Sequence, residues 1–139
     1  MKAFAQAGII LALSAVLAAA SYLARPEVLP WDRGELEVEL EEALGWEQAI
    51  WLDARVEEDF RRGSYQGALP MNEENWESGL APFLDQWTPE RPVVVFCSSQ
   101  SCLRSDSVAR RLRSELGVEN VYSLAGGWEA MVDAGLIDR

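Results

Sequence analysis

The chain has 139 residues and a net charge of −11 at pH 7. This length leaves room for one globular domain, and the negative charge makes nucleic acid an unsuitable partner. The chain contains no histidine, which excludes Ser-His-Asp and Cys-His catalysis and histidine-ligated metal sites. Two cysteines are too few for a structural zinc site, so we expect neither a metal nor another cofactor.

Residues 3–24 form an apolar segment without a charged residue. As a helix this segment would be roughly 33 Å long, which is enough to cross the core of a bilayer. It is interpreted either as a single-pass membrane anchor or as a secretory signal peptide with a cleavage stretch at residues 18–20. We expect residues 1–25 to be such an anchor or signal, and we favour the anchor. The rest of the chain is expected outside the cytoplasm, either periplasmic or, if the segment is cleaved, secreted.

A linker and then a domain are expected to follow this segment. Prolines at positions 26 and 30 predict a linker over residues 26–34, and the domain is expected to span residues 35–139. Leucines at every fourth position predict a helix over residues 35–44. The apolar run at residues 49–53 has the length and composition of a buried strand.

Helices and turns are predicted to alternate in the middle of the domain. A short helix is predicted over residues 56–62, and a turn-rich stretch with a short strand at residues 68–69 follows it. Asn72 is a suitable N-cap for a helix that extends to about Trp87, with a break at Pro82 as an alternative.

The last third of the chain has the clearest strand pattern. We predict strands at residues 93–96 and 121–124, and helices at residues 105–116 and 128–134. Short apolar strands that alternate with helices predict a three-layer α/β/α domain, in which a small, mainly parallel sheet has helices on both faces. Ligands of such sheets bind at the carboxyl ends of the strands.

Cys97 and Asp53 are both expected at this carboxyl edge. Cys97 ends a predicted strand, and a polar loop and a helix N-terminus follow it. Backbone N–H groups and the helix dipole favour negative charge at such a position, and they would lower the pKa of the thiol. Cys97 is therefore a candidate nucleophile, although a small core residue would occupy the same position.

Four segments carry a further signal, because they occur in a recognisable order. They are Trp51–Arg55, Phe60–Pro70, Val94–Cys97 and Asn120–Trp128. Together they resemble the motifs of the rhodanese-like domain family over about residues 35–137. The first segment is similar to a hydrophobic-Asp-x-Arg motif, and the last is similar to an Asn-Val-x-x-Leu-x-Gly-Gly ending. The second segment departs at two positions, since Ser64 and Gln66 stand where histidine and proline are usual.

The resemblance implies a sulfurtransferase. In this chemistry the Cys97 thiolate accepts a sulfane sulfur from a small donor, becomes a persulfide, and passes the sulfur to a thiol or another nucleophile, which is a small molecule or a protein. Asp53 and Arg55 are expected to support the site as an ion pair that ties the strand ends together. The expected substrate-binding residues follow the cysteine directly: Ser98, Ser99, Gln100, Ser101, Cys102, Leu103 and Arg104.

The loop after Cys97 departs from the family pattern. Six residues separate Cys97 from Arg104, whereas sulfurtransferases of the family usually have four and related phosphatases have five. The loop also contains a second cysteine, Cys102, and no glycine. Three alternatives stay open: a thiol–disulfide protein that uses Cys97 and Cys102, a non-catalytic rhodanese-like binding module and, ranked last, a phosphatase.

Overall fold

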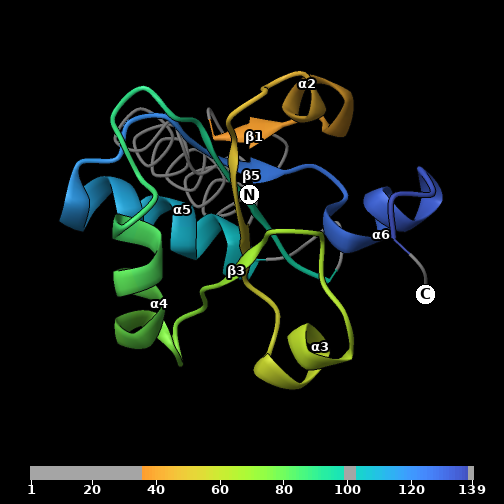
Figure 1. The fold of residues 1–139 in the computed structure, drawn as a ribbon, viewed down its shortest axis with the longest axis horizontal. Helices are drawn as coiled ribbons and strands as arrows, with labels where there is room; N and C mark the ends of the chain where they lie inside the picture. Colours follow the sequence, from red (N-terminus) through yellow and green to blue (C-terminus); the bar gives the residue numbers. More distant parts are fainter. Residues whose placement is uncertain (1–35, 99–102, 138–139) are drawn as a thin grey trace, which may run out of the picture. The chain divides into compact units, whose positions relative to one another are not determined.

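The computed structural model describes residues 36–98 and 103–137 (Figure 1), which belong to a compact unit, Glu35–Arg139. Among these residues, no helix is long and apolar enough to cross a membrane. The apolar segment at residues 3–24 lies outside the described residues, and so does the predicted linker. The anchor and the signal peptide therefore remain predictions.

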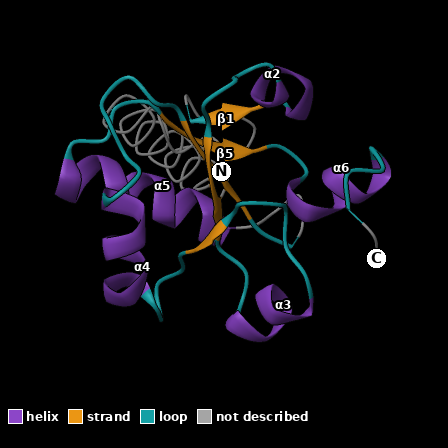
Figure 2. Cartoon of the chain, viewed as in Figure 1, coloured by secondary structure: helices purple, strands orange, loops and turns teal. Residues whose placement is uncertain are grey.

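A parallel sheet forms the centre of the domain, as the sequence predicted, and it has five strands (Figure 2). Each pair of neighbouring strands is parallel, and the order across the sheet is β1-β5-β4-β2-β3. The long connections between parallel strands are helical, as this topology requires. The strands are β1 (Glu37–Val38), β2 (Ile50–Asp53), β3 (Leu69–Pro70), β4 (Val93–Phe96) and β5 (Val121–Leu124).

Helices cover both faces of the sheet. Figure 1 shows α4 and α5 on one side of the strands and α2, α3 and α6 on the other. The two hydrophobic clusters agree with this division, since one includes residues of α4 and α5 and the other includes residues of α2 and α6. The helices are α2 (Leu40–Leu44), α3 (Glu57–Arg62), α4 (Trp76–Leu84), α5 (Leu103–Leu116) and α6 (Gly127–Asp133).

The central strands β2 and β4 are buried along their whole length. Successive side chains of a strand point to opposite faces, so alternate residues of β4 enter different clusters. Val93 and Val95 pack with α4 and α5, whereas Val94 and Phe96 pack on the opposite face. Burial on both faces explains why these strands are largely apolar. Because β2 and β4 are parallel, with Asp53 opposite Phe96, their carboxyl ends lie at the same edge of the sheet.

The predicted helix over residues 35–44 is wrong in its first half. Glu37 and Val38 form the edge strand β1, which pairs with β5, and α2 begins only at Leu40. Leu36 and Val38 are both buried, which is the alternation of a strand. The spacing of four between leucines fits a helix, but the open edge of β5 supplies backbone hydrogen bonds that favour the extended conformation.

The long helix predicted from Asn72 to Trp87 is shorter at both ends. The Asn72 side-chain oxygen accepts hydrogen bonds from the backbone N–H groups of Glu74 and Asn75, at 2.8 and 2.9 Å, and so forms a turn before α4 begins at Trp76. Pro82 lies inside α4, so the alternative of a break at this residue does not occur. The helix ends at Leu84.

Candidate active site

Cys97 lies directly after β4, at the carboxyl edge of the sheet. The side chain is 1% exposed and packs in the same hydrophobic cluster as Val95 and Val108. In the structure Cys97 is disulfide-bonded. A small molecule that reacts with this sulfur must therefore find it reduced.

Helix α5 begins at Leu103, two residues earlier than predicted. Leu103 and Arg104 are therefore residues of the first helical turn, and not of the loop. The Leu103 side chain is 80% exposed. Ser98 is exposed in the loop, whereas the other predicted substrate-binding residues, 99–102, lie outside the described residues.

The first two residues of α6, Gly127 and Trp128, hold the backbone of Cys97. The backbone N–H group of Trp128 donates a 2.7 Å hydrogen bond to the Cys97 carbonyl oxygen. Gly127 has a φ of 53°, and a Cβ atom added to it would lie 2.3 Å from that same oxygen. Only glycine allows both this φ value and this close approach. No feature of the sequence indicated that Gly127 contacts Cys97.

Substitution of Gly127 by alanine is expected to lower the free energy of unfolding by at least about 3 kcal/mol, because backbone strain adds to a clash with backbone atoms. Gly135 is the matched control: its φ is 71°, but nothing lies within 4 Å of an added Cβ atom. Gly135→Ala is expected to cost about 1 kcal/mol, for the backbone alone. Urea unfolding of both variants tests the difference, and equal costs would contradict the close packing of Gly127 on Cys97.

Asp53 and Arg55, at the end of the neighbouring strand, form the ion pair that the sequence predicted. Arg55 Nη2 lies 2.7 Å from Asp53 Oδ2, and Arg55 Nε lies 3.0 Å from Oδ1. The side chains are 6% and 0% exposed. Arg55 Nη2 also donates to the Gly63 carbonyl oxygen at 2.6 Å, so the pair connects the end of β2 to the end of α3.

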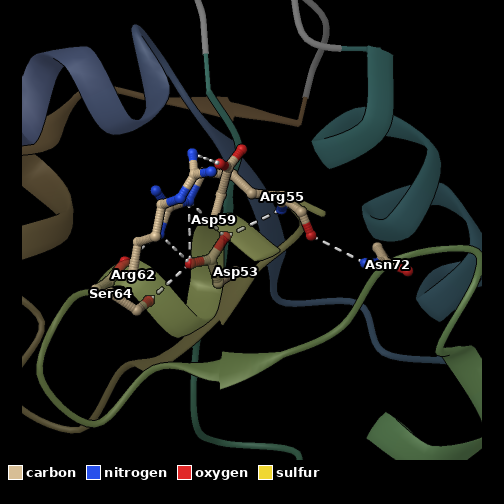
Figure 3. A network of polar contacts seen from close by, with 7 residues as sticks. Asp53, Arg55, Asp59, Arg62, Ser64 and Asn72 are labelled. Atoms are coloured by element: carbon tan, nitrogen blue, oxygen red, sulfur yellow. Dashed lines mark hydrogen bonds and ion pairs between the residues drawn. The ribbon is translucent and has the colours of Figure 1, made fainter. Parts of the chain in front are cut away.

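Two residues that sequence reasoning did not assign to the site complete this network (Figure 3). The Ser64 hydroxyl donates a 2.7 Å hydrogen bond to Asp53 Oδ2, and the Asn72 amide donates one of 2.9 Å to the Arg55 carbonyl oxygen. Ser64 is the residue that stands where the family usually has histidine, so its position in the motif was a usable signal. The buried charges are thus satisfied within the protein, as buried ion pairs require.

Trp128 connects this network to Cys97. Its ring lies under the Arg55 guanidinium, whose Cζ atom is 3.6 Å from the ring centroid, and its backbone N–H group donates to the Cys97 carbonyl oxygen. The ring also stacks on Phe96, the last residue of β4. Trp128 is half-buried and contacts both parts of the site.

A pocket of about 470 Å³ lies beside this arrangement. Two of its lining residues, Arg55 and Trp128, flank the end of β4, and they place the pocket near that strand end. This volume is in the range of small-molecule sites. The lining residues are Arg55, Asp59, Arg62, Gly63, Ser64, Trp128 and Ile137.

Comparison with known proteins gives a family and named relatives. Residues 37–134 match the model of the rhodanese-like domain family. The thiosulfate sulfurtransferase GlpE of Actinobacillus succinogenes is 36% identical over 90 residues, which are 65% of this chain and 75% of the relative. The thiosulfate sulfurtransferase GlpE of Shewanella oneidensis is 37% identical over 83 residues, which are 60% of this chain and 75% of the relative.

Solved structures with a similar fold include two of low sequence identity. The BH2092 protein of Bacillus halodurans superposes with a TM-score of 0.58 at 17% identity, covering 85% of this chain and 80% of that protein. A protein from Lactobacillus plantarum superposes with a TM-score of 0.50 at 18% identity, covering 88% of this chain and 93% of that protein. At these identities the likeness shows the fold alone.

Proposed function

This chain belongs to the rhodanese-like domain family, and from that premise we propose that it is a sulfurtransferase that carries sulfane sulfur on Cys97. The observation that carries the proposal is the position of Cys97 at the carboxyl end of β4, with its carbonyl oxygen held by the first turn of α6. Two relatives named as thiosulfate sulfurtransferases, at 36% and 37% identity, support it. The donor is a small sulfur compound, and the acceptor is a thiol or another nucleophile.

In the proposed first step, the Cys97 thiolate attacks the sulfane sulfur of thiosulfate. A new S–S bond forms to Cys97 Sγ, the S–S bond of thiosulfate breaks, and sulfite leaves with the electron pair. Cys97 is then a persulfide. The N-terminus of α5, a helix of 14 residues, follows the loop and is expected to stabilise the negative charge on the outer sulfur. We propose that residues 98–104 contribute the remaining contacts to the donor.

In the second step, the thiolate of an acceptor attacks the outer sulfur of the persulfide. The bond between that sulfur and Cys97 Sγ breaks, and Cys97 regains its electron pair as a thiolate. The acceptor leaves as a persulfide. No change of oxidation state outside the sulfur atoms is needed, so the cycle requires no further reductant or oxidant.

Intact-mass spectrometry tests the proposal directly. The reduced full-length protein is desalted and incubated with thiosulfate, and its intact mass is then measured. We expect a gain of about 32 Da, one sulfur, that is lost on addition of a thiol. A chain that never gains this mass, with either thiosulfate or a polysulfide as donor, would contradict the proposed function.

One observation favours a second candidate, a thiol–disulfide protein. Cys97 is disulfide-bonded in the structure. The chain has two cysteines, so we propose Cys102, which lies outside the described residues, as the partner within the chain. A reversible disulfide without any sulfur uptake would identify this candidate, since the oxidised chain weighs two hydrogens less than the reduced chain.

The same disulfide leads to a prediction for sulfur transfer. We expect sulfur uptake from thiosulfate only after treatment with a reductant that is then removed, because a disulfide-bonded Cys97 has no thiolate to attack the donor. Cys102→Ser is the matched variant, and it is expected to take up sulfur without the reductant. Full uptake by the untreated, unsubstituted protein would contradict this dependence.

We also propose that residues 3–24 attach the protein to a membrane and that the domain lies outside the cytoplasm. The uncharged length of this segment supports the proposal. Alkaline carbonate extraction of membranes tests it, since an anchored chain stays in the pellet. Recovery of the intact chain in the supernatant would contradict the anchor.

A further inference from the structure

A buried serine lies in the first turn of α5. In the part of the chain that the structure describes, the buried polar or charged side chains are Asp53, Arg55, Asn72 and Ser105. The first three belong to the ion-pair network at the end of β2. Ser105 is 3% exposed, and its Oγ atom lies 2.8 Å from that of Ser123, so the two hydroxyls share a hydrogen bond that joins α5 to β5.

This hydroxyl pair lies on the same face of the sheet as the Cys97 side chain. In the register of the sheet, Ser123 of β5 is opposite Val95 of β4, and Cys97 follows two residues later. Residues two apart in a strand point to the same face, and Val95 and Cys97 both pack in the cluster that includes Val108 of α5. The hydrogen bond between Ser105 and Ser123 thus ties the first turn of α5 to the strand beside β4.

The position of α5 decides how strongly its N-terminus acts on the sulfur. The first N–H groups of a helix have no partner within it, and together with the helix dipole they form a positive end. Because Gly127 and Trp128 of α6 hold the backbone of Cys97, the distance from the sulfur to this positive end depends on where α5 lies. Coulomb attraction falls with distance, so a small displacement of α5 weakens the stabilisation of a thiolate or persulfide anion.

Stability alone does not explain two hydroxyls at this position. A hydrogen bond between neutral groups adds little net stability, and the replacement of both partners by apolar groups is nearly neutral. The next residues of α5 that pack against the sheet, Val108, Ala109 and Leu112, are apolar and fully buried. A hydrogen bond differs from such contacts because it is directional, and it therefore fixes both the distance and the angle between the two elements.

Resting on the proposed sulfurtransferase function, we propose that Ser105 and Ser123 are a positioning pair for Cys97. Their hydrogen bond holds the first turn of α5 at the distance where its N–H groups and dipole stabilise the anionic sulfur. Neither hydroxyl takes part in the bond changes at sulfur, since the pair acts through the position of α5. It therefore supports the Cys97 thiolate and the persulfide alike.

Removal of either hydroxyl is expected to raise the pKa of the Cys97 thiol. The reference is the reduced full-length Cys102→Ser protein, in which Cys97 is the sole cysteine, and the ultraviolet absorbance of its thiolate is followed against pH. Ser123→Ala is expected to raise the titration midpoint by about half a pH unit, which lowers the thiolate fraction below the midpoint about threefold. Persulfide formation from thiosulfate, followed by intact mass, should slow by a similar factor.

The charged residues around Cys97 stay the same in these variants. The end of β2, the first turn of α5 and the first turn of α6 adjoin Cys97. Their charged residues are Asp53, Arg55, Arg104, Asp106 and Glu129. A change in the titration midpoint therefore reports the position of α5 and not the loss of a charge.

Further variants test whether the two hydroxyls act as one unit. Because they share one hydrogen bond, Ser105→Ala, Ser123→Ala and the double variant are expected to raise the midpoint equally. Ser123→Thr keeps the hydroxyl and is expected to keep the midpoint of the reference. Ser114→Ala is the matched control, because the Ser114 hydroxyl donates to the Arg111 carbonyl oxygen within the same helix.

The outcomes separate this proposal from the proposed function. If the reference chain takes up sulfur while Ser105→Ala and Ser123→Ala match it in midpoint and rate, the positioning pair is refuted and the sulfurtransferase stands. If urea unfolding shows lower stability in both variants but the midpoint is unchanged, the pair is merely structural and the proposal is refuted as well. If the midpoint rises as expected but no chain gains sulfur, the pair positions a thiolate and the sulfurtransferase is refuted.

Discussion

Cys97→Ser is expected to abolish sulfur uptake from thiosulfate, with a loss of at least about a thousandfold in rate, because a serine hydroxyl at this position replaces the only proposed nucleophile. The fold should persist, since serine has nearly the same volume as cysteine. Sulfur uptake is measured by intact mass and the fold by circular dichroism, both under reducing conditions.

Cys102→Ser is the matched control for this experiment. It removes the other cysteine of the chain, and it is expected to retain measurable sulfur transfer. If Cys97→Ser still gains sulfur, the site is misassigned. If both variants lose transfer equally, a relay between two cysteines replaces the single-cysteine mechanism.

Asp53→Asn is expected to cost about 3–5 kcal/mol of unfolding free energy, because it leaves the Arg55 guanidinium buried without a counter-charge. Because asparagine has nearly the same shape as aspartate, the change in unfolding free energy comes from the lost charge and not from a cavity. Urea unfolding followed by tryptophan fluorescence gives the difference in free energy.

Glu57→Gln is the matched control for the ion pair. Glu57 pairs with Arg61 on the exposed surface of α3, where the side chains are 61% and 72% exposed. Exposed pairs of this kind contribute about 0–1 kcal/mol. Equal costs for Asp53→Asn and Glu57→Gln would show that burial of the Asp53–Arg55 pair has no energetic role.

The sheet was predictable because its central strands are buried on both faces. The apolar runs at Ile50–Asp53 and Val93–Phe96 have no helical alternation, so their type and approximate limits followed from composition alone. The edge strand β1 was not predictable in this way. It has two residues, and its conformation depends on pairing with β5, which is distant in the sequence.

The arrangement of the candidate site was predictable where it depends on the ends of strands, and not where it depends on contacts between segments that are distant in the sequence. Cys97 and the Asp53–Arg55 pair followed from their positions after buried strands. The contacts of Trp128 with Arg55 and Cys97 did not, because they require three segments to meet in space. Asp59 and Arg62 appeared as ordinary residues of a charged helix, and only the pocket distinguishes them from Arg61.

The pairing of β1 with β5 has a consequence for how the domain is made. Glu37 lies near the start of the domain and Ser123 near its end, yet they are partners in the sheet. A ribosome must therefore release almost the whole domain before its first strand has a neighbour. Until then residues 36–38 have no partner strand, and the closure of the sheet is a late, long-range step of folding.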